Sequence, residues 1–551
     1  MCNRVHKVAS AAFLAVVLLA TLAGSAQAAP GDLDPSFGTA GLVTTDFGGR
    51  GDFGLAVALQ SDGKIVAAGN SSAVGVFSVN FALARYNTNG SLDSTFGNGG
   101  TVLTSFGGNL SAAFDVAVQP DGKIVTVGVA GSGAAGSDFG IARYSTDGTL
   151  DPTFGSGGLV TTDFGGGSDQ ATGVALQPDG KIVVVGPLQG TFGVARYNPD
   201  GSLDSTFGSG GQVITDASPS FDGAFDVVVW SGRIVVGGGT GLFASGASDF
   251  QLVRYNGDGT LDSSFGGSGI VTTDFGASDN IFGIAVTADG KITAAGGTRG
   301  ASPGDFALAR YNSDGSLDST FDGDGKTTTD FSADSDDVGE GVVVQPDGSI
   351  TVGGIAGSGS PGTAFAVVRY TATGNLDAAF GSGGKASAVF GNPINNAWDI
   401  VAQPDGKVVV AGGTGDFTRG ITDFALARFL GAPTILNVSV DVKPDSSSNV
   451  IPLQGNGVIP VAILTTDAFD AASVDPASVC FGSANDPTTR DCTAKQGTGH
   501  LQDVNGDARA DLLLQYETQQ TGIRPGDTQA CLTGQTYDGV SIEGCDRIVT
   551  K

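Results

Sequence analysis

Histidine is almost missing from this 551-residue sequence, in which only His500 lies beyond the first 28 residues. Histidine-based metal centres, catalytic triads and histidine general bases are therefore almost excluded from residues 29–430. No Gly-x-Ser-x-Gly nucleophile motif occurs in a strand-to-helix context. Paired carboxylates are the catalytic chemistry that the composition still allows, for example Asp334, Asp336 and Asp337, although such a cluster is more typical of a solvated or cation-binding loop.

Positive charge is also scarce, with 27 basic residues against 56 acidic ones and a formal net charge of −29. Nucleic acids and anionic lipids attract surfaces rich in Lys and Arg, so neither is expected as a partner. The acidity suits divalent cations and a soluble chain whose copies repel each other. We therefore expect a monomer.

Long apolar runs are confined to the start of the chain. Arg4 and Lys7 precede an apolar stretch from Ala11 to Ala23, and Ala26-Gln27-Ala28 forms a small-residue cleavage site. This is the pattern of a Sec-type signal peptide over residues 1–28, and it is too short for a stable membrane span. Cys2 stands at the wrong end of the signal for a lipid anchor. The sequence thus predicts a secreted protein, extracellular or periplasmic.

Cysteine is missing between Cys2 and the last 72 residues, which contain Cys480, Cys492, Cys531 and Cys545. An even number in an exported chain favours two disulfides, with three possible connectivities. We predict Cys480–Cys492 and Cys531–Cys545, because each pair closes a small local loop.

Glycine, by contrast, is abundant, with 91 residues, and the chain contains an internal sequence repeat. A Leu-Asp pair recurs at intervals of 53 to 59 residues, at Leu33, Leu92, Leu150, Leu203, Leu261, Leu317 and Leu376. Such a period indicates a repeat architecture. In the third copy, alternating or Val/Ile-rich runs bounded by turn residues predict four strands, at 171–177, 181–186, 192–198 and 211–216.

Seven copies of four antiparallel strands predict an all-β, seven-bladed propeller over residues 29–430. The last copy stops after its third strand, at Phe424–Phe429, whereas the chain begins with an unmatched Leu33–Gly38 and a strand-like Gly41–Phe47. We predict that this N-terminal strand completes the seventh blade, which closes the ring and removes two sheet edges.

Segments of the types QPDGKIVVxG, FALARYNxDG and LDxxFGxxG recur in fixed order over about residues 31–430. They resemble the delta-60 repeat, a family of uncharacterised bacterial β-propeller repeats. The resemblance implies the propeller fold and a bacterial source, and the family brings no established activity. The first hairpin of each copy is also similar to that of an NHL-type propeller blade, a likeness of fold only.

Every copy contains one Arg in its third strand and one Asp after the hallmark Leu. Matched numbers favour structural Arg–carboxylate pairs over a ring of guanidinium groups that binds an anion. The Arg residues are Arg85, Arg143, Arg196, Arg254, Arg310, Arg369 and Arg428, and the Asp residues are Asp34, Asp93, Asp151, Asp204, Asp262, Asp318 and Asp377. The hallmark Phe three residues after each Asp is expected in the core between blades.

The copies differ most in the loops that join the second and third strands. These loops are residues 70–80, 129–138, 187–191, 240–249, 298–305, 356–364 and 414–423. In a propeller they share a face with the connections between blades, opposite the uniform Asp-Gly turns. We therefore place a ligand on this variable face, with Phe77, Phe243, Phe417 and Trp398 as aromatic contacts, although loop drift without selection for binding explains the variation equally well.

Residues 431–551 lack the repeat and contain a calcium-loop pattern. Oxygen side chains of Asp503, Asn505, Asp507 and Asp511, with the backbone carbonyl of Arg509, can surround Ca²⁺. The spacing resembles the DxNGDxxxD loop of calcium-binding hairpins, except that Ala508 replaces the usual Gly, which strains the turn. The alternative is an Asx-rich turn without metal. The stretches GVIPVAIL and ACLTG also resemble a short module of secreted bacterial proteins, which implies all-β structure. With the two predicted disulfides, residues 431–551 are expected to form a small disulfide-bonded β module.

The leading hypothesis is a secreted, non-catalytic binding or scaffold protein that holds a glycan or protein on the variable face, with structural Ca²⁺ in the C-terminal module. The alternative is an extracellular hydrolase or lyase that uses carboxylates and calcium in the propeller funnel. The scarcity of His favours binding. A purely structural role is a third possibility.

Overall fold

The structure is a computed structural model that describes residues 28–49, 51–72, 78–131, 136–165, 167–218, 222–241, 248–299, 303–331, 335–358, 362–416, 419–431, 435–444, 446, 448–454, 457–466, 469–495, 499–537 and 540–551. Apart from Ala28, the predicted signal peptide lies outside this part of the chain.

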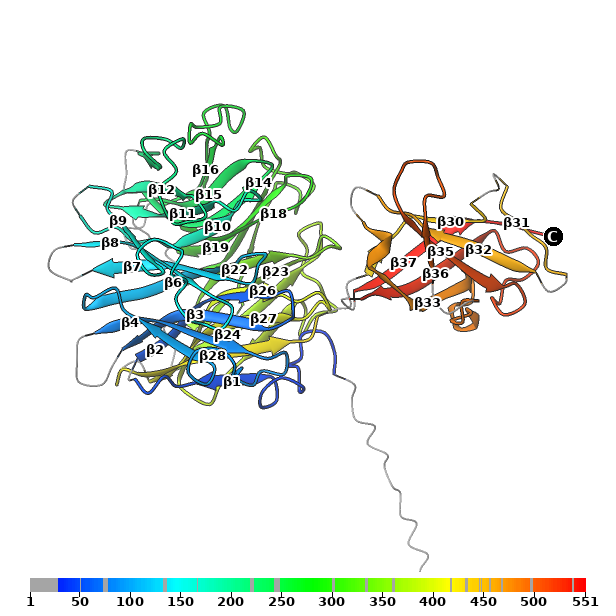
Figure 1. The fold of residues 1–551 in the computed structure, drawn as a ribbon, viewed down its shortest axis with the longest axis horizontal. Helices are drawn as coiled ribbons and strands as arrows, with labels where there is room; N and C mark the ends of the chain where they lie inside the picture. The colour runs from blue at the N-terminus through cyan, green and yellow to red at the C-terminus, as the bar shows by residue number, and fades with distance from the viewer. Residues whose placement is uncertain are drawn as a thin grey trace, which may run out of the picture.

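The predicted fold class is confirmed: each of seven repeats forms a four-stranded antiparallel sheet, or blade (Figure 1). The innermost strands contact one another in sequence order, and the last contacts the first. They are β2 (Gly51–Leu59), β6 (Leu110–Val118), β10 (Gly173–Leu176), β14 (Asp222–Trp230), β18 (Ser278–Val286), β22 (Asp336–Val344) and β26 (Ile394–Ala402).

The second and third strands of each blade are continuous apolar runs, because neighbouring blades cover both of their faces. The second strands are β3 (Ile65–Ser72), β7 (Ile124–Gly131), β11 (Ile182–Leu188), β15 (Arg233–Thr240), β19 (Ile292–Arg299), β23 (Ile350–Ser358) and β27 (Val408–Asp416). The third strands are β4 (Val79–Tyr86), β8 (Ser137–Tyr144), β12 (Thr191–Tyr197), β16 (Phe250–Tyr255), β20 (Asp305–Tyr311), β24 (Ala364–Tyr370) and β28 (Ile421–Phe429).

The outer strands are short and partly exposed, which limits the edge that each blade presents. They are β5 (Thr101–Thr104), β9 (Leu159–Thr162), β13 (Gln212–Thr215), β17 (Ile270–Thr273), β21 (Lys326–Thr329) and β25 (Lys385–Ala388) in the first six blades. In the seventh blade the outer strand comes from the N-terminus: β1 (Leu42–Thr45) pairs antiparallel with β28, and Leu42 lies opposite Ala427. Figure 1 shows β1 beside β28.

The core lies between blades. The hallmark Phe residues, predicted to pack there, are at most 1% exposed and belong to seven separate apolar clusters, each built from two adjacent blades. A buried hydrogen bond crosses the same boundaries, as between the Tyr86 and Thr45 hydroxyls at 2.8 Å. Packing thus makes each blade depend on its neighbours.

The C-terminal residues form separate small sheets. One has the order β29 (Ile435–Asn437), β37 (Ser541–Arg547), β36 (Gln529–Thr536) and β33 (Val474–Ser483). The second has the order β30 (Val440–Val442), β32 (Val458–Ile463), β35 (Asp511–Glu517) and β34 (His500–Gln502), and β31 (Val450–Ile451) pairs with β38 (Val549–Thr550). The two disulfides join Cys480 to Cys492 and Cys531 to Cys545.

Within the described part of the chain, no helix is long and apolar enough to span a membrane. The helical segments there are two 3₁₀ turns, Ala471–Ser473 and Pro487–Thr489.

Candidate functional site

One face of the propeller contains the Asp-Gly turns, and we call it the Asp-Gly face. The opposite face contains the variable loops and the connections between blades, and we call it the loop face. The second and third strands of each blade run between them, so a residue's place along a strand decides which face it reaches.

On the Asp-Gly face the Arg of each third strand is held in a repeated clamp. Arg85 donates from Nε to Asp93 Oδ2 at 2.9 Å and from Nη1 to the carbonyl oxygen of Thr146, in the next blade, at 2.5 Å. Its guanidinium lies 4.5 Å from the centre of the Phe96 ring. The other six pairs are Arg143–Asp151, Arg196–Asp204, Arg254–Asp262, Arg310–Asp318, Arg369–Asp377 and Arg428–Asp34. In six of the seven blades, all but the sixth, the guanidinium also donates from Nη1 to a backbone oxygen of the next blade and so joins the two.

The clamp has a third charged member that the sequence analysis missed. Lys64, in the turn between the first two strands, lies 3.4 Å from Asp93, and corresponding pairs are Lys123–Asp151, Lys181–Asp204, Arg233–Asp262, Lys291–Asp318 and Lys407–Asp34. Burial would raise the pKa of Asp93, but hydrogen bonds from Thr95 and the charges of Arg85 and Lys64 lower it to about 2. The recurring Lys after Asp-Gly was the available signal.

The sixth blade departs from this pattern for reasons visible in its sequence. Ser349 stands in place of the Lys, and Ala379 in place of the Ser or Thr that elsewhere accepts from Arg Nη2. Arg369 turns its Nη2 toward Ser349, 3.0 Å away, and its Nε and Nη1 make no hydrogen bond within the described residues. The side chain of Asp377 is 21% exposed, against 6% for Asp93.

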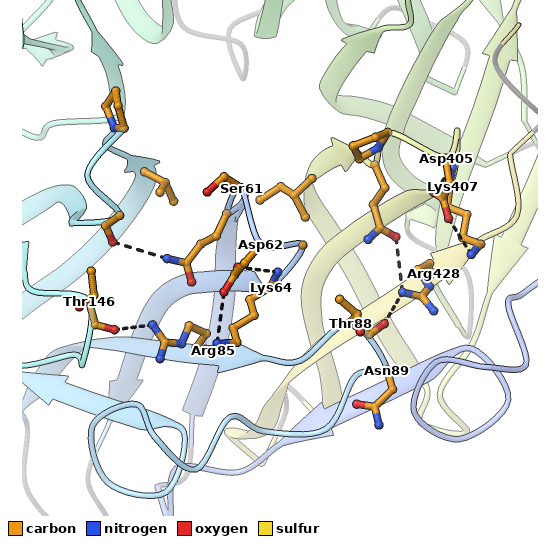
Figure 2. Close-up of a pocket in the computed structure, with 18 of the residues that line it drawn as sticks. Ser61, Asp62, Lys64, Arg85, Thr88, Asn89, Thr146, Asp405, Lys407 and Arg428 are labelled. Carbon is orange, nitrogen blue, oxygen red and sulfur yellow. Dashed lines mark hydrogen bonds and ion pairs between the residues drawn. The ribbon is translucent and has the colours of Figure 1, made fainter. Parts of the chain in front are cut away.

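A cavity of ≈ 1170 Å³ opens on the Asp-Gly face between the seventh, first and second blades (Figure 2). Figure 2 shows Ser61, Asp62 and Lys64 on one side and Asp405 and Lys407 on the other. Its cationic residues already pair with carboxylates, as Lys407 does with Asp405 of its own turn at 2.7 Å and with Asp34 of the clamp at 3.5 Å. The lining is polar and is built from positions that most repeats share.

The centre of the propeller contains four acidic side chains on innermost strands, Asp115, Asp226, Glu340 and Asp399, which we call the central carboxylates. A register shift in each strand places them there, for example between Ala113 and Asp115. Burial raises the pKa of Asp226 to about 6, of Asp399 to about 7 and of Glu340 to about 8. Burial and the charges of Asp226 and Asp399 also raise the pKa of Asp115.

Three of the central carboxylates connect blades. Asp115 accepts the N–H of Val116 in its own strand and that of Val174 in the next blade, both at 2.7 Å. Asp226 bridges to Ile284, and Asp399 bridges to Val57, in the same way. Both oxygens of each Asp are therefore engaged by backbone, whereas Glu340 has no such bond among the described residues.

Of the four aromatic residues predicted to contact a ligand on the loop face, only Trp398 lies in the described part of the chain. Phe77, Phe243 and Phe417 lie outside the described residues, as does Asp334. Trp398 lies in the register shift of β26, an innermost strand, and its ring is 5.9 Å from that of Phe53 in an edge-on arrangement. Trp398 is therefore part of the centre of the propeller, not of a variable loop.

At three junctions between blades, the loop face gathers three Asp residues whose carboxylate oxygens lie within 4.8 Å of one another. We call these groups the junction triads. In each, one Asp begins a third strand, one follows the outer strand, and one lies in the next innermost strand or just before it. The triads are Asp423, Asp46 and Asp52; Asp138, Asp163 and Asp169; and Asp249, Asp274 and Asp279. The sequence analysis did not single them out.

In the C-terminal module, the predicted calcium loop is a network of Asx turns. Asp503 accepts the N–H groups of Gly506 and Ala508, at 2.7 and 2.9 Å, while the buried Asp511 accepts those of Thr465 and Val504. Ala508 has a φ of 66°, the conformation for which Gly is usual. Asn505 and Asp507 are exposed, and Arg509 follows them in the same turn. The oxygen-rich donor set fits a hard cation, although among described residues its carboxylates are not gathered as the junction triads are.

The comparisons with known proteins agree with the fold. Seven stretches match the family described as a domain of unknown function (DUF5122) beta-propeller: residues 60–96, 119–154, 177–207, 231–265, 287–321, 345–380 and 403–431. The first six end at a hallmark Phe. The chain therefore belongs to a β-propeller repeat family. The delta-60 resemblance and the C-terminal calcium module stay predictions.

Among solved structures, the chain is similar to a virginiamycin B lyase from Staphylococcus aureus, at 10% identity and a TM-score of 0.40 over 70% of this chain and 98% of that one. It is similar to PorZ of the type-IX secretion system of Porphyromonas gingivalis, at 12% identity and 0.39 over 92% and 60%. The propeller domain of the Trilobed protease from Pyrococcus furiosus gives 11% and 0.37 over 69% and 94%. The search of curated proteins finds no match. Similarity at this level assigns no activity.

Proposed function

We propose that this is a secreted, monomeric, non-catalytic binding or scaffold protein that holds a glycan or protein ligand on its loop face. The observation that carries the proposal is the contrast between the two faces. The charges of the Asp-Gly face are engaged in nearly the same clamp in every blade, whereas the loop face differs from blade to blade. A specific ligand needs positions that differ, and loops on a rigid scaffold supply them.

The central carboxylates also favour binding over catalysis. An acid or base must exchange a proton with a substrate. Asp115, Asp226 and Asp399 instead accept two backbone N–H groups each, which fits a role in holding blades together. Nucleic acid and membrane are not proposed as partners.

A hydrolase or lyase in the funnel is the second candidate, and Glu340 is the residue that favours it. Its carboxyl has a pKa raised to about 8 by burial, so it is protonated at neutral pH and could donate a proton. If the funnel is catalytic, Glu340→Gln abolishes turnover in a reducing-end screen of polysaccharides. If binding is the function, no turnover appears and the variant binds as the parent does.

The test of the leading proposal is a glycan array probed with residues 29–551, with calcium and then with chelator. A hit is followed by two variants. The first replaces residues 240–249 by residues 187–191, a short loop of the same repeat position, and should lose binding. The second is Asp62→Asn in the Asp-Gly cavity, which should bind normally. Loss of binding in the second variant alone would move the ligand to the Asp-Gly face.

Structural calcium in the Asp503–Asp511 loop is part of the proposal. Ca²⁺ would neutralise the exposed carboxylates of a turn that its own backbone already shapes. Loss of the ion by Asp507→Asn should lower the melting temperature of the C-terminal module in calcium and leave it unchanged in chelator.

A further inference from the structure

The three repeat positions of a junction triad exist at every junction between blades, but not every junction has Asp at them. At the junction of the first and second blades the same three positions are Asn80, Ser105 and Ser111. At the junction of the sixth and seventh they are Ala364, Val389 and Asn395. These two junctions thus lack all three carboxylates, whereas the junction of the third and fourth blades keeps two of them, Asp216 and Asp222, and has Thr191 at the remaining position.

The innermost-strand residue of each triad has a structural duty that does not need a charge. Asp52, Asp169 and Asp279 each accept the N–H of the Phe two residues after the preceding outer strand, at 2.7 to 3.0 Å. Ser111 does the same for Phe106, and Asn395 does it for Phe390. A neutral oxygen suffices for this bond, so the carboxylates of the triads require another explanation.

In the first and third triads, the second carboxylate oxygen of this residue supplies that explanation. The side chains of Asp52 and Asp279 are 0% exposed, and in both the Oδ1 atom makes no hydrogen bond within the described residues. A buried, unsatisfied carboxylate oxygen is costly, and the cost is greatest beside other carboxylates. Within the described part of the chain, no ion pair reaches the first or the third triad. Lys326, near the third triad, donates instead to the backbone oxygen of Asp274.

We propose that each junction triad binds one Ca²⁺, which ties two adjacent blades together on the loop face. Three carboxylates in reach of one point offer the oxygen ligands that a hard divalent cation prefers, and backbone oxygens and water complete its shell. The three junctions are also those at which Asp399, Asp115 and Asp226 bridge the blades at the centre of the propeller. A cation at the rim and a carboxylate at the centre then fix the same pairs of blades.

A fourth junction sharpens the assignment. Asp305, Asp330 and Asp337 occupy the triad positions between the fifth and sixth blades, yet they do not form such a group among the described residues. Burial, Asp330 and Asp337 raise the pKa of Asp305, and Lys385 opposes them. No ion is assigned to this junction, because its three carboxylates are not gathered within reach of one point.

The test is calcium titration of residues 29–551 by calorimetry in about 0.15 M NaCl, where weak surface attraction is screened. The variants Asp46→Asn, Asp163→Asn and Asp274→Asn change the exposed member of each triad. Asn keeps the acceptor that holds the following Gly N–H, so folding is preserved. Each should remove about one bound ion or weaken it by roughly tenfold or more.

The matched control is Asp216→Asn, the same repeat position at the junction where Thr191 replaces the third carboxylate, and it should leave the stoichiometry unchanged. Asp507→Asn should remove only the ion of the C-terminal loop. Equal stoichiometry in the wild type and all three triad variants, or no calcium binding by the wild type, would overturn the inference. It does not depend on the proposed function, since calcium binding and a blank glycan array can coexist.

Discussion

Asp residues on the two faces of the propeller have different charged neighbours. On the Asp-Gly face each buried Asp is met by an Arg and, in six blades, by a second cation from the turn. On the loop face three junctions gather Asp residues, and within the described part of the chain no ion pair reaches the first or the third of these triads. The first face is complete within the chain, whereas the second requires a cation from solution. Charge balance, not residue type, therefore separates a structural carboxylate from a binding one.

Removing residues 30–48 breaks both faces at once and should have the largest effect. The deletion takes away β1, the Asp34 partner of Arg428 and the Asp46 member of one triad, and it exposes the edge of β28. We expect loss of cooperative unfolding and a mostly insoluble protein. Adding the missing segment as a peptide should restore part of the soluble fraction. Unchanged melting and solubility would contradict the predicted closure of the ring.

Arg143→Ala should lower the free energy of unfolding by about 3 kcal/mol, because it leaves Asp151 buried with one weaker cationic partner. Arg369→Ala in the sixth blade is the matched control. It should cost about half as much, because Arg369 already lacks the full clamp. Urea unfolding followed by tryptophan fluorescence measures both. Equal losses would mean that the clamp's additional contacts add nothing.

In the absence of calcium, the carboxylates of the two faces should make stability depend on pH in opposite directions. The pKa of Asp93 is lowered to about 2, so its stabilisation is present above pH 4 and is lost as the pH falls toward 2. Burial, with Asp274 and Asp249, raises the pKa of Asp279 to about 6, so its ionisation destabilises the fold as the pH rises from about 4 to 6.

Asp279→Asn should therefore stabilise the calcium-free protein at pH 7 by on the order of 2 kcal/mol and leave it unchanged at pH 4. Denaturant midpoints at the two pH values measure this difference. The decline from pH 6 to 8 should persist in the variant, because burial also raises the pKa of Asp399 to about 7 and that of Glu340 to about 8. A gain at pH 4 as large as that at pH 7 would exclude titration as the cause.

The smallest change restores the clamp of the sixth blade. Ala379→Thr gives Arg369 a hydroxyl acceptor like Thr320, which accepts from Arg310 Nη2 in the fifth blade, and it should stabilise the protein by about 0.5–1 kcal/mol. Ala379→Val has the same shape without the hydroxyl and should give no gain in melting temperature. A similar gain from both would assign the effect to packing.

The fold could be predicted from the sequence because the pattern of each strand occurs in seven copies. Its four predicted strands in the third copy lie within a few residues of β10 to β13. The C-terminal disulfides were also predicted correctly. The Arg–Asp partners were found because both occur in every copy.

The junction triads were missed for the opposite reason, since only some copies have them and their members come from two repeats. Trp398 was placed on the loop face because a register shift cannot be read from a strand of alternating residues. The raised pKa of Glu340 depends on burial at the centre, which no local pattern encodes.

The pairing of β1 with β28 also affects the order in which the blades can form. Asp34 and Arg428 are 394 residues apart, so the first strand emerges long before its partner. Six blades form from contacts within about 60 residues of chain, whereas the seventh waits for the last part of the repeat region. During that interval β1 and then β28 present unpaired edges, to which another copy of the chain could add a strand. Late joining of the two ends is therefore the step at which folding and aggregation compete.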